Sequence, residues 1–368
     1  MPATGNVVLA MNAGSSSVKF ALYRMNNEEE TLLFSGSGED VPANEDLTDR
    51  LMKRPGFDQL TAIVHRVVHG MAHTHPEVIT PALIKELKSL VSYDPEHLPA
   101  EIKLIEMFLK TFPELPQFAC FDTAFHQTMP LVAQTLAIPR KYLQQGIRRY
   151  GFHGMSYQYL IQQLGQVNND NVSNSRVIIA HLGSGASLAA IKDGQSIDTS
   201  MGFTPGAGVP MSTRSGDLDP GISAYLIQQE RLNPTQFNHL VNHESGLLGV
   251  SETSSDIRKL LRIKDKDNRA AEAVDLFCYQ ISKYIGSYAA ALGGLDTLVF
   301  SGGIGEHLPE VREQICRNLG FLGIELNSKE NLENANIIST GKTCVRIIPT
   351  NEALMMARLI TRDLTHEI

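Results

Sequence analysis

Runs of apolar, β-branched residues alternate along the chain with amphipathic segments of helical period. The runs are bounded by Gly or Pro and predict buried strands, whereas the segments between them predict helices. Alternation of this kind is typical of an α/β protein with parallel strands, in which ligands bind at the carboxyl ends of the strands. The predicted strands are 7–12, 61–68, 117–122, 176–182 and 296–303. The predicted helices are 81–91, 98–112, 221–230 and 270–292.

One segment near the N-terminus is similar to a second segment far along the chain. Residues 7–23 superpose on 177–194 with an offset of 170 (177 minus 7), which pairs Ala10 with Ala180. Each segment predicts a strand, a tight Gly/Ser turn and a second strand. A duplicated fold would present two Gly/Ser hairpins to a shared cleft, where small residues let backbone N–H groups approach a phosphate. The alternative is a chance match between two apolar strands.

Composition limits the class of protein. The chain has 368 residues, enough for two domains of ordinary size. No apolar run approaches the roughly 20 residues that a membrane-spanning helix needs, and the N-terminus lacks the features of a secretory signal. Four cysteines are scattered without metal-ligand spacing, which indicates a reducing, cytoplasmic location. A net charge of −8 without a basic tract argues against nucleic acid or an anionic membrane as the main partner.

The segment 204–221 is too rich in Gly and Pro to form a helix or a central strand, yet it carries an arginine and two aspartates. Loops on a rigid scaffold keep their side chains accessible to a ligand. We expect Arg214 to project from this loop into the cleft, and Asp217 and Asp219 to hold the loop and its arginine in place. The alternative is a solvated turn with a local ion pair.

Nine short motifs occur in one order over nearly the whole chain. They are MNAGSSSVKF (11–20), HRVVHG (65–70), FDTAFHQTMP (121–130), RRYGFHG (148–154), HLGSGAS (181–187), DTSMGFTP with TRSGDLDP (198–220), SGLLGVS with SSDIR (245–258), GGIGE (302–306) and TNEALMMA (350–357). Each motif alone is weak, but together they strongly resemble the acetate kinase family.

The resemblance implies a duplicated RNase H-like fold of the actin and sugar kinase type, with a cleft between two domains. Residues 1–122 and 355–368 would form the N-terminal domain, to which the last helix returns. Residues 123–354 would form the nucleotide-binding C-terminal domain. The resemblance also implies a homodimer that transfers a phosphoryl group reversibly from ATP to acetate, giving acetyl phosphate and ADP, with Mg²⁺ or Mn²⁺.

The residues are suited to this chemistry. A carboxylate nucleophile has a pKa of roughly 4 to 5 and is already ionised at neutral pH, so it needs no general base. The reaction needs positive charge instead, because an anion approaches a polyphosphate. Arg66 and Arg214 meet this need, since guanidinium groups bind carboxylate and phosphate oxygens bidentately. A sugar kinase, by contrast, must deprotonate a hydroxyl and uses an aspartate base.

The resemblance assigns roles to individual residues. Arg66 and Arg214 would hold the substrate carboxylate and the transferring phosphoryl group, with Arg214 closer to the transition state. His153 would contact the transition state, and Asp122 would orient an arginine or assist transfer. From the residues alone, alternatives remain: a structural ion pair for Arg66, a buried hydrogen-bonded histidine for His153, and a sugar-kinase base for Asp122.

Other positions match the family's ligand-binding segments. Asn12 and Glu352 resemble residues placed against the phosphates and Mg²⁺, although a glutamate in a first helical turn is also favoured by the helix dipole. Val68, Phe152 and Pro205 resemble the small apolar pocket for the acyl tail. Residues matched to nucleotide binding are Lys19, His181, Leu182, Gly183, Ser184, Gly185, Asp256, Ile257, Arg258, Gly303, Ile304, Gly305, Glu306 and His307.

The chain also departs from the family. Ser184 and His307 stand where Asn is usual, which leaves the donor open between ATP, another nucleoside triphosphate and pyrophosphate. In 94–100, Glu96 replaces an apolar residue, and a charge beside an apolar pocket is costly unless it is paired or solvated. The alternative functions are a propionate or butyrate kinase and, from another class, an actin-like or chaperone-like ATPase switch. The two arginines and the histidine argue against a switch.

Overall fold

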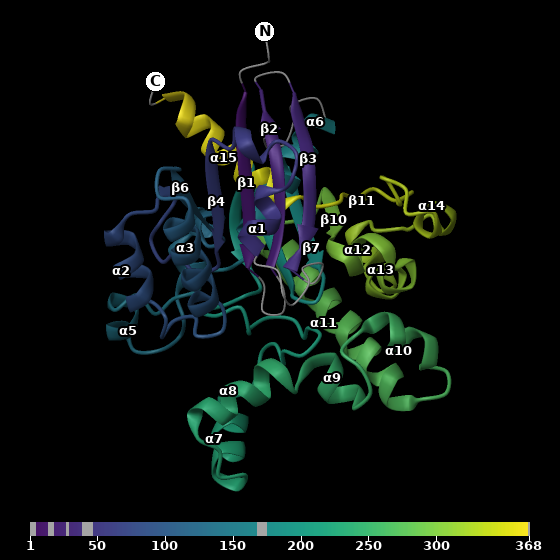
Figure 1. Cartoon of the computed structure of the whole chain (residues 1–368). Helices are drawn as coiled ribbons and strands as arrows, with labels where there is room; N and C mark the ends of the chain where they lie inside the picture. The colour runs from purple at the N-terminus through teal and green to yellow at the C-terminus, as the bar shows by residue number, and fades with distance from the viewer. Residues whose placement is uncertain (1–4, 14–17, 27–28, 39–46, 168–174, 367–368) are drawn as a thin grey trace. The chain divides into compact units, whose positions relative to one another are not determined.

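The computed structural model describes residues 5–13, 18–26, 29–38, 47–167 and 175–366, which form two mixed sheets with their helices (Figure 1). The chain divides into two compact units. Unit 1 contains Met1–Gln127, His153–Tyr159 and Asn351–Ile368, and unit 2 contains Thr128–Phe152 and Leu160–Thr350. The Gly/Ser turn predicted at 14–17 lies outside the described residues.

Unit 1 contains a six-stranded sheet. Its strands are β1 (Asn6–Ala13), β2 (Val18–Met25), β3 (Glu30–Ser37), β4 (Ala62–Val67), β5 (Glu77–Val78) and β6 (Gln117–Phe121). They have the order β3-β2-β1-β4-β6-β5. β1, β4 and β6 run parallel, whereas β2, β3 and β5 are antiparallel to their neighbours. The carboxyl ends of the three parallel strands therefore lie at one edge of the sheet, the edge at which α/β proteins bind ligands.

Both faces of this sheet are covered by helices. α15 (Glu352–His366), yellow in Figure 1, packs on one face of β1, β2 and β4, and α3 (Leu98–Thr111) packs on β1 and β4. Because successive side chains of a strand point to opposite faces, alternate residues of β1 contact different helices. Val8 and Ala10 share a buried cluster with Met356 of α15, whereas Leu9 shares one with Phe108 of α3. Because β1 is buried on both faces, it is apolar without alternation.

Unit 2 contains a five-stranded sheet. Its strands are β7 (Arg176–Leu182), β8 (Ala186–Lys192), β9 (Gln195–Thr199), β10 (Thr297–Ser301) and β11 (Cys344–Ile347). They have the order β11-β10-β7-β8-β9, with β7, β10 and β11 parallel and β8 and β9 antiparallel. The long helix α11 (Asn268–Leu292) packs against β7, β8 and β9 and buries Phe277, Ile281 and Ile285.

The two sheets share one topology. β3-β2-β1-β4-β6 of unit 1 matches β9-β8-β7-β10-β11 of unit 2 in order and in strand direction. The similar segments found at an offset of 170 (177 minus 7) begin in the matching strands β1 and β7. The predicted α/β class with a duplicated two-sheet fold is therefore confirmed.

The strand predicted at 296–303 ends earlier than expected. β10 ends at Ser301, and Gly302 begins the helix α12 (Gly302–His307) with a φ of 75°. A Cβ atom on Gly302 would lie 2.6 Å from the carbonyl oxygen of Leu182, so only glycine fits this turn. The prediction was too long because a glycine pair after an apolar run was included in the strand.

The remaining helices complete the two units. They are α1 (Leu47–Met52), η2 (Phe57–Gln59), α2 (Pro81–Ser89), η3 (Ala124–Thr128), α4 (Leu131–Gln134), α5 (Arg140–Gln144), α6 (Gly154–Val167), α7 (Pro220–Gln229), α8 (Pro234–His243), α9 (Gly246–Ser251), α10 (Ile257–Ile263), α13 (Pro309–Cys316), η4 (Gly320–Leu322) and α14 (Ser328–Leu332). Within the described part of the chain, none of the helices combines the length and apolar character needed to cross a membrane.

Candidate active site

An arginine and an aspartate meet at the ends of two neighbouring parallel strands of unit 1. Arg66 lies on β4, and Asp122 directly follows β6. The Arg66 Nε atom donates to Asp122 Oδ1 at 2.9 Å, and Nη2 donates to Oδ2 at 2.5 Å. The Asp122 side chain is fully buried, whereas that of Arg66 is 14% exposed. This bidentate contact fixes the plane of the guanidinium group and leaves its outer edge accessible.

The outer edge of the Arg66 guanidinium faces Asn12, from β1, and Glu352, from α15. Nη1 donates to Asn12 Oδ1 at 3.1 Å and lies 3.6 Å from Glu352 Oε2. Among the described residues, the hydrogen bonds of Arg66 engage three of its five N–H groups. Two N–H groups, one on Nη1 beside Glu352 and one on Nη2, make no hydrogen bond within the described residues.

Burial and charge act in opposite directions on this pair. Burial lowers the pKa of Arg66, but the carboxylates of Asp122 and Glu352 outweigh it, and the pKa is raised overall. Arg66 therefore stays charged at any physiological pH. Burial raises the pKa of Asp122, Arg66 opposes that shift, and Glu352 adds to it. The site thus holds a permanent cation beside a buried carboxyl group whose position the cation fixes.

His153 is held against the same aspartate. Its backbone N–H donates to Asp122 Oδ2 at 3.2 Å, and its φ is 60°, in the left-handed region. The next residue is glycine because a Cβ atom on Gly154 would lie 2.0 Å from the carbonyl oxygen of Asp122. The turn is therefore pressed against the end of β6, and this close approach places His153 beside the Arg66–Asp122 pair.

Glu352 lies in the first turn of α15, and two side chains donate hydrogen bonds to its carboxylate. Its Oε2 atom accepts a hydrogen bond from Asn12 Nδ2 at 3.0 Å, and its Oε1 atom accepts one from the hydroxyl group of Ser156 at 2.6 Å. Lys19 lies opposite Asn12 in the register of β1 and β2, with its side chain exposed. Five predicted site residues of unit 1 thus lie in one connected cluster, and Lys19 is beside it. The five are Asn12, Arg66, Asp122, His153 and Glu352.

The oxygen atoms in this cluster fit a hard divalent cation. Mg²⁺ is usually held by one or two carboxylates together with substrate phosphates and water. Glu352 offers a carboxylate, and Asn12 offers an amide oxygen, which accepts from Arg66 while the amide nitrogen donates to Glu352. In the part of the chain that the structure describes, no group of three or more His, Cys, Asp or Glu side chains could hold a metal. A cation here would therefore depend on ligand oxygens for much of its coordination.

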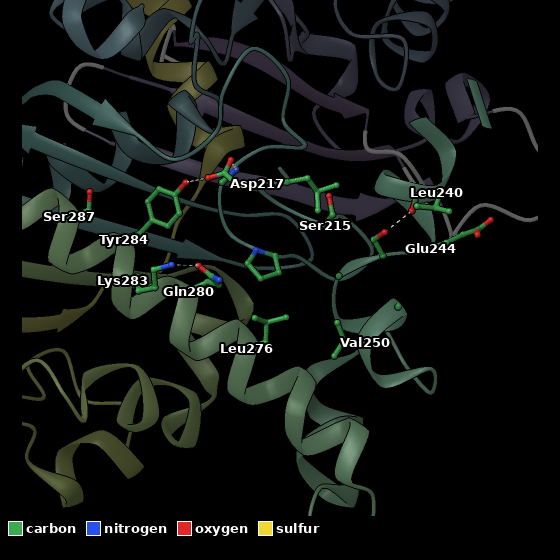
Figure 2. Close-up of a pocket in the computed structure, with 16 residues that line it drawn as sticks. Ser215, Asp217, Leu240, Glu244, Val250, Leu276, Gln280, Lys283, Tyr284 and Ser287 are labelled. Carbon is green, nitrogen blue, oxygen red and sulfur yellow. Dashed lines mark hydrogen bonds between the residues drawn. The ribbon is translucent and has the colours of Figure 1, made fainter. Parts of the chain in front are cut away.

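The loop that carries Arg214 is fastened to the long helix of unit 2. Asp217 Oδ1 accepts from the backbone N–H of Gly208 at 2.8 Å, and its Oδ2 accepts from the hydroxyl group of Tyr284 on α11 (Figure 2). Arg214 itself donates from Nη1 to the carbonyl oxygen of Pro205 at 3.3 Å. Asp217 and Tyr284 also line a cavity of about 920 Å³ beside this loop.

The expectation for the two loop aspartates is only partly correct. Asp217 holds the loop, but its hydrogen bonds go to Gly208 and Tyr284 rather than to Arg214. Asp219 is the N-cap of α7 and accepts from Gly221 N at 2.7 Å. Asp219 therefore has an ordinary capping role, which the pattern Asp-Pro-Gly at the start of a predicted helix could have revealed.

Two predicted nucleotide segments lie at one sheet edge in unit 2. His181 and Leu182 end β7, and Gly183, Ser184 and Gly185 form the turn that follows, with Gly183 N donating to Gly185 O at 3.0 Å. Ser301, which directly precedes α12, is paired with His181 in the sheet register. The carbonyl oxygen of Ser184 also accepts from the N–H of Ser212, which connects this turn to the Arg214 loop.

The residues of the second and third nucleotide segments differ in exposure and contacts. α12 contains Gly303, Ile304 and Gly305. In the same helix, Glu306 accepts hydrogen bonds from the backbone N–H of Gly302 at 2.8 Å and of Thr350 at 3.3 Å. The side chain of His307 is exposed. Asp256 is the N-cap of α10, where Ile257 is buried, and it pairs with Arg258 through Nη2 at 2.8 Å. Glu306 is therefore tied to the chain's own backbone, and α10 packs on α11.

The comparisons with known proteins decide the family. Residues 41–358 match the model of the acetokinase family. The chain belongs to the acetokinase family. It is 41% identical over 392 residues to an acetate kinase of Rhodopseudomonas palustris, covering 97% of this chain and 98% of that protein. It is 39% identical over 394 residues to a propionate kinase of Yersinia enterocolitica, covering 96% of each chain. It is also similar to the crystal structure of Porphyromonas gingivalis acetate kinase, with a TM-score of 0.87 and 35% identity. This match covers 98% of this chain and 100% of that chain.

Membership of the acetokinase family confirms the predicted family and the predicted enzyme class. The sequence did not predict Ser156 as a site residue, although its hydroxyl group donates a hydrogen bond to Glu352. Its position three residues after His153, at the start of α6, was the available signal. The apolar residues of the predicted acyl pocket fall on both units: Val68 belongs to unit 1, while Phe152 and Pro205 belong to unit 2, and all three are buried.

Proposed function

We propose that this protein catalyses reversible phosphoryl transfer from ATP to acetate, which gives acetyl phosphate and ADP. The observation that carries the proposal is the Arg66 guanidinium, fixed by buried Asp122 at the ends of β4 and β6, with N–H groups left for a ligand. Acetate is ionised at neutral pH, so the site needs a placed cation rather than a base. Membership of the acetokinase family supports the same reaction.

The reaction is a direct in-line transfer. A carboxylate oxygen of acetate attacks the γ-phosphorus of ATP, the bond to the β,γ-bridging oxygen breaks, and the electron pair leaves with ADP. Arg66 binds the carboxylate, and Arg214 and His153 stabilise the charge on the transferring phosphoryl group. Asp122 acts as the orienting group of Arg66 and His153, because the substrate has no proton for it to remove.

We further propose that Mg²⁺, or Mn²⁺, binds with the nucleotide phosphates at Asn12 and Glu352. When bound, the cation neutralises part of the phosphate charge. Ser156 keeps the Glu352 carboxylate in place through its hydroxyl group. Lys19 is near enough to Asn12 in the sheet to meet a phosphate. The remaining nucleotide contacts that we propose are those of His181 to Gly185, Asp256 to Arg258 and Gly303 to His307.

The choice among short-chain acids depends on the residues that contact the alkyl group. Val68, Phe152 and Pro205 are proposed to form a small apolar pocket for the methyl group of acetate. Propionate kinase is a second candidate because a relative of that name is 39% identical over 96% of the chain, and one methylene changes discrimination in an apolar pocket by only about 1–3 kcal/mol. A butyrate kinase would need a larger pocket. The ATPase-switch alternative is set aside because the chain belongs to the acetokinase family.

We also propose a cytoplasmic homodimer, with residues 1–122 and 355–368 as one domain and 123–354 as the other. Exposed apolar side chains on α7 and α11 support self-association: Tyr225 is 63% exposed and Tyr279 is 62% exposed. Ile222 and Leu276, on the same two helices, are also exposed. Exposed apolar side chains of this size favour a partner surface. Sedimentation of the protein against a Tyr225→Lys, Tyr279→Lys double variant tests the dimer.

A hydroxamate trap for acyl phosphate tests the reaction. Acetate, propionate and butyrate are each combined with ATP, GTP and pyrophosphate, and the trapped product is measured against a no-acid control. We expect acetate with ATP to give the highest kcat/KM. The proposal is wrong if ATP turns over while no acid gives a trapped product. Higher kcat/KM with propionate would make propionate the substrate and leave the mechanism unchanged.

A further inference from the structure

The backbone that follows β4 is held by side chains rather than by a neighbouring strand. The N–H of Val68 donates to the carboxyl group of Glu101, 3.1 Å from Oε2 and 3.3 Å from Oε1. The N–H of Gly70 donates to the hydroxyl group of Thr123 at 3.1 Å. Glu101 and Thr123 are both buried. The position of this segment therefore depends on two buried polar side chains.

Glu101 lies in a setting that is unfavourable for a carboxyl group. It is in the first turn of α3, and its side chain faces β4. Burial raises the pKa of Glu101 well above its ordinary value, and nearby Asp94 raises it further. Asp94 is also buried and accepts from His97 Nδ1 at 2.9 Å if that nitrogen carries the proton. A buried carboxyl group costs free energy unless hydrogen bonds offset it, and for Glu101 the hydrogen-bonding partner is the Val68 amide.

The sequence drew attention to a different acidic residue in this region. Glu96 is the charged residue that departs from the family beside the predicted pocket, but it is partly exposed. Within residues 94–101, the buried acidic groups are Asp94 and Glu101. Glu101 is the one that contacts the backbone of a proposed substrate residue.

The Val68 amide is a sensitive position for the proposed reaction. Arg66 is the last but one residue of β4, and Val68 directly follows the strand, so only Val67 separates the two. Arg66 is proposed to bind the carboxylate of the acid, and Val68 is proposed to contact its alkyl end. A shift of the Val68 backbone would therefore change the distance available between the charged and the apolar contact.

We propose that Glu101 is a positioning residue that holds the Val68 amide and so sets the length of acid accepted between Arg66 and Val68. This inference rests on the proposed function. Glu101 itself contacts the backbone and not the substrate. It acts on the acid-binding side, because it contacts the backbone of Val68, whereas the nucleotide contacts proposed at 181–185, 256–258 and 303–307 belong to unit 2.

Two substitutions separate the hydrogen bond from the volume of the side chain. Glu101→Met fills a similar volume but has no acceptor for the Val68 N–H, so the segment can withdraw. Glu101→Gln keeps a carbonyl oxygen and restores the hydrogen bond without a charge. We expect Glu101→Met to raise KM for acetate about tenfold and to shift the acetate-to-propionate ratio of kcat/KM towards propionate, with KM for ATP unchanged. Glu101→Gln should stay within about twofold of the wild type.

A matched control lies on the same helix. Glu106 is exposed and pairs with Lys88 at 2.6 Å, so Glu106→Met should leave both KM values and the acid ratio unchanged. Backbone amide hydrogen exchange gives a readout that does not depend on activity. Glu101→Met should accelerate exchange at residues 68–70, Glu101→Gln should not, and neither should alter residues 297–307.

The outcomes separate this inference from the proposed function. A wild type that forms no acyl phosphate overturns both. This inference alone is overturned if the wild type is active but Glu101→Met keeps the acetate-to-propionate ratio of kcat/KM. It is also overturned if Glu101→Met raises KM for ATP as much as KM for acetate. Unchanged exchange at 68–70 also overturns it. If Glu101→Met does not fold, Glu101→Asp, which withdraws the carboxyl group by one methylene, is measured in the same way and with the same criteria.

Discussion

Asp122 accepts two hydrogen bonds from Arg66 across the ends of two parallel strands, at 2.9 and 2.5 Å, while its own side chain is fully buried. A buried carboxyl group of this kind is stable only with its partner, because removal of the cation leaves an uncompensated charge. The pair therefore links the stability of unit 1 to the geometry of the proposed acid-binding site.

Arg66→Ala is expected to destabilise the protein as well as abolish acyl phosphate formation. It leaves the buried Asp122 carboxyl group unpaired, which costs about 3–5 kcal/mol in the free energy of unfolding. Addition of Asp122→Asn should recover part of this loss, because the amide carries no charge. Urea unfolding of the single and double variants measures both effects. Arg24→Ala, which removes an arginine paired with Gln59 in the same unit, is the control and should change stability by less than about 1 kcal/mol.

Arg214→Ala should lower activity without lowering stability, unlike Arg66→Ala. Arg214 lies in a loop, and its hydrogen bond to the Pro205 carbonyl oxygen is long, at 3.3 Å. We expect the variant to fold normally and to lose about 10²–10³ in kcat, since it lacks a charge that acts on the transferring phosphoryl group. Steady-state kinetics and the unfolding midpoint are measured together. Arg262→Ala, which removes an exposed arginine of unit 2, is the control. Near-normal turnover of Arg214→Ala would exclude Arg214 from the mechanism.

Tyr284→Phe tests whether the Arg214 loop must be fastened to α11. The tyrosine hydroxyl group donates to Asp217, which in turn holds the Gly208 amide (Figure 2). Burial raises the pKa of Tyr284, so the hydroxyl group remains a donor at neutral and mildly alkaline pH. Loss of one such contact should lower kcat about tenfold, the effect of about 1.4 kcal/mol, with KM for acetate nearly unchanged. Tyr142→Phe, at another exposed tyrosine of unit 2, should have no effect.

The sequence predicts the parts of the site that depend on strand ends, but not those that depend on contacts across long separations. Arg66 and Asp122 follow from apolar runs and the parallel order that these runs predict. The contact of Asn12 with Glu352 joins residues that are 340 positions apart, and the contact of Tyr284 with Asp217 spans 67. Such pairs depend on how helices pack on the sheets, which local patterns do not specify. The same reason explains why Ser156 and Glu101 were not predicted.

Stability at mildly acidic pH should depend on a buried histidine of β4. His65 is fully buried, and its Nε2 atom lies 2.9 Å from Gln117 Oε1. Burial lowers the pKa of His65 from 6.5 to about 4, so the folded state keeps the ring neutral while the unfolded state takes up a proton below pH 6.5. The contribution of neutral His65 to the free energy of unfolding is therefore complete above pH 6.5 and is lost as the pH falls from 6.5 to about 4, by about 3 kcal/mol in total.

Urea unfolding between pH 7 and 5 tests this prediction. The free energy of unfolding should fall less for His65→Leu than for the wild type. His239→Gln, at an exposed histidine, should behave like the wild type. Equal losses in all three proteins would show that His65 does not take up a proton on unfolding in this range.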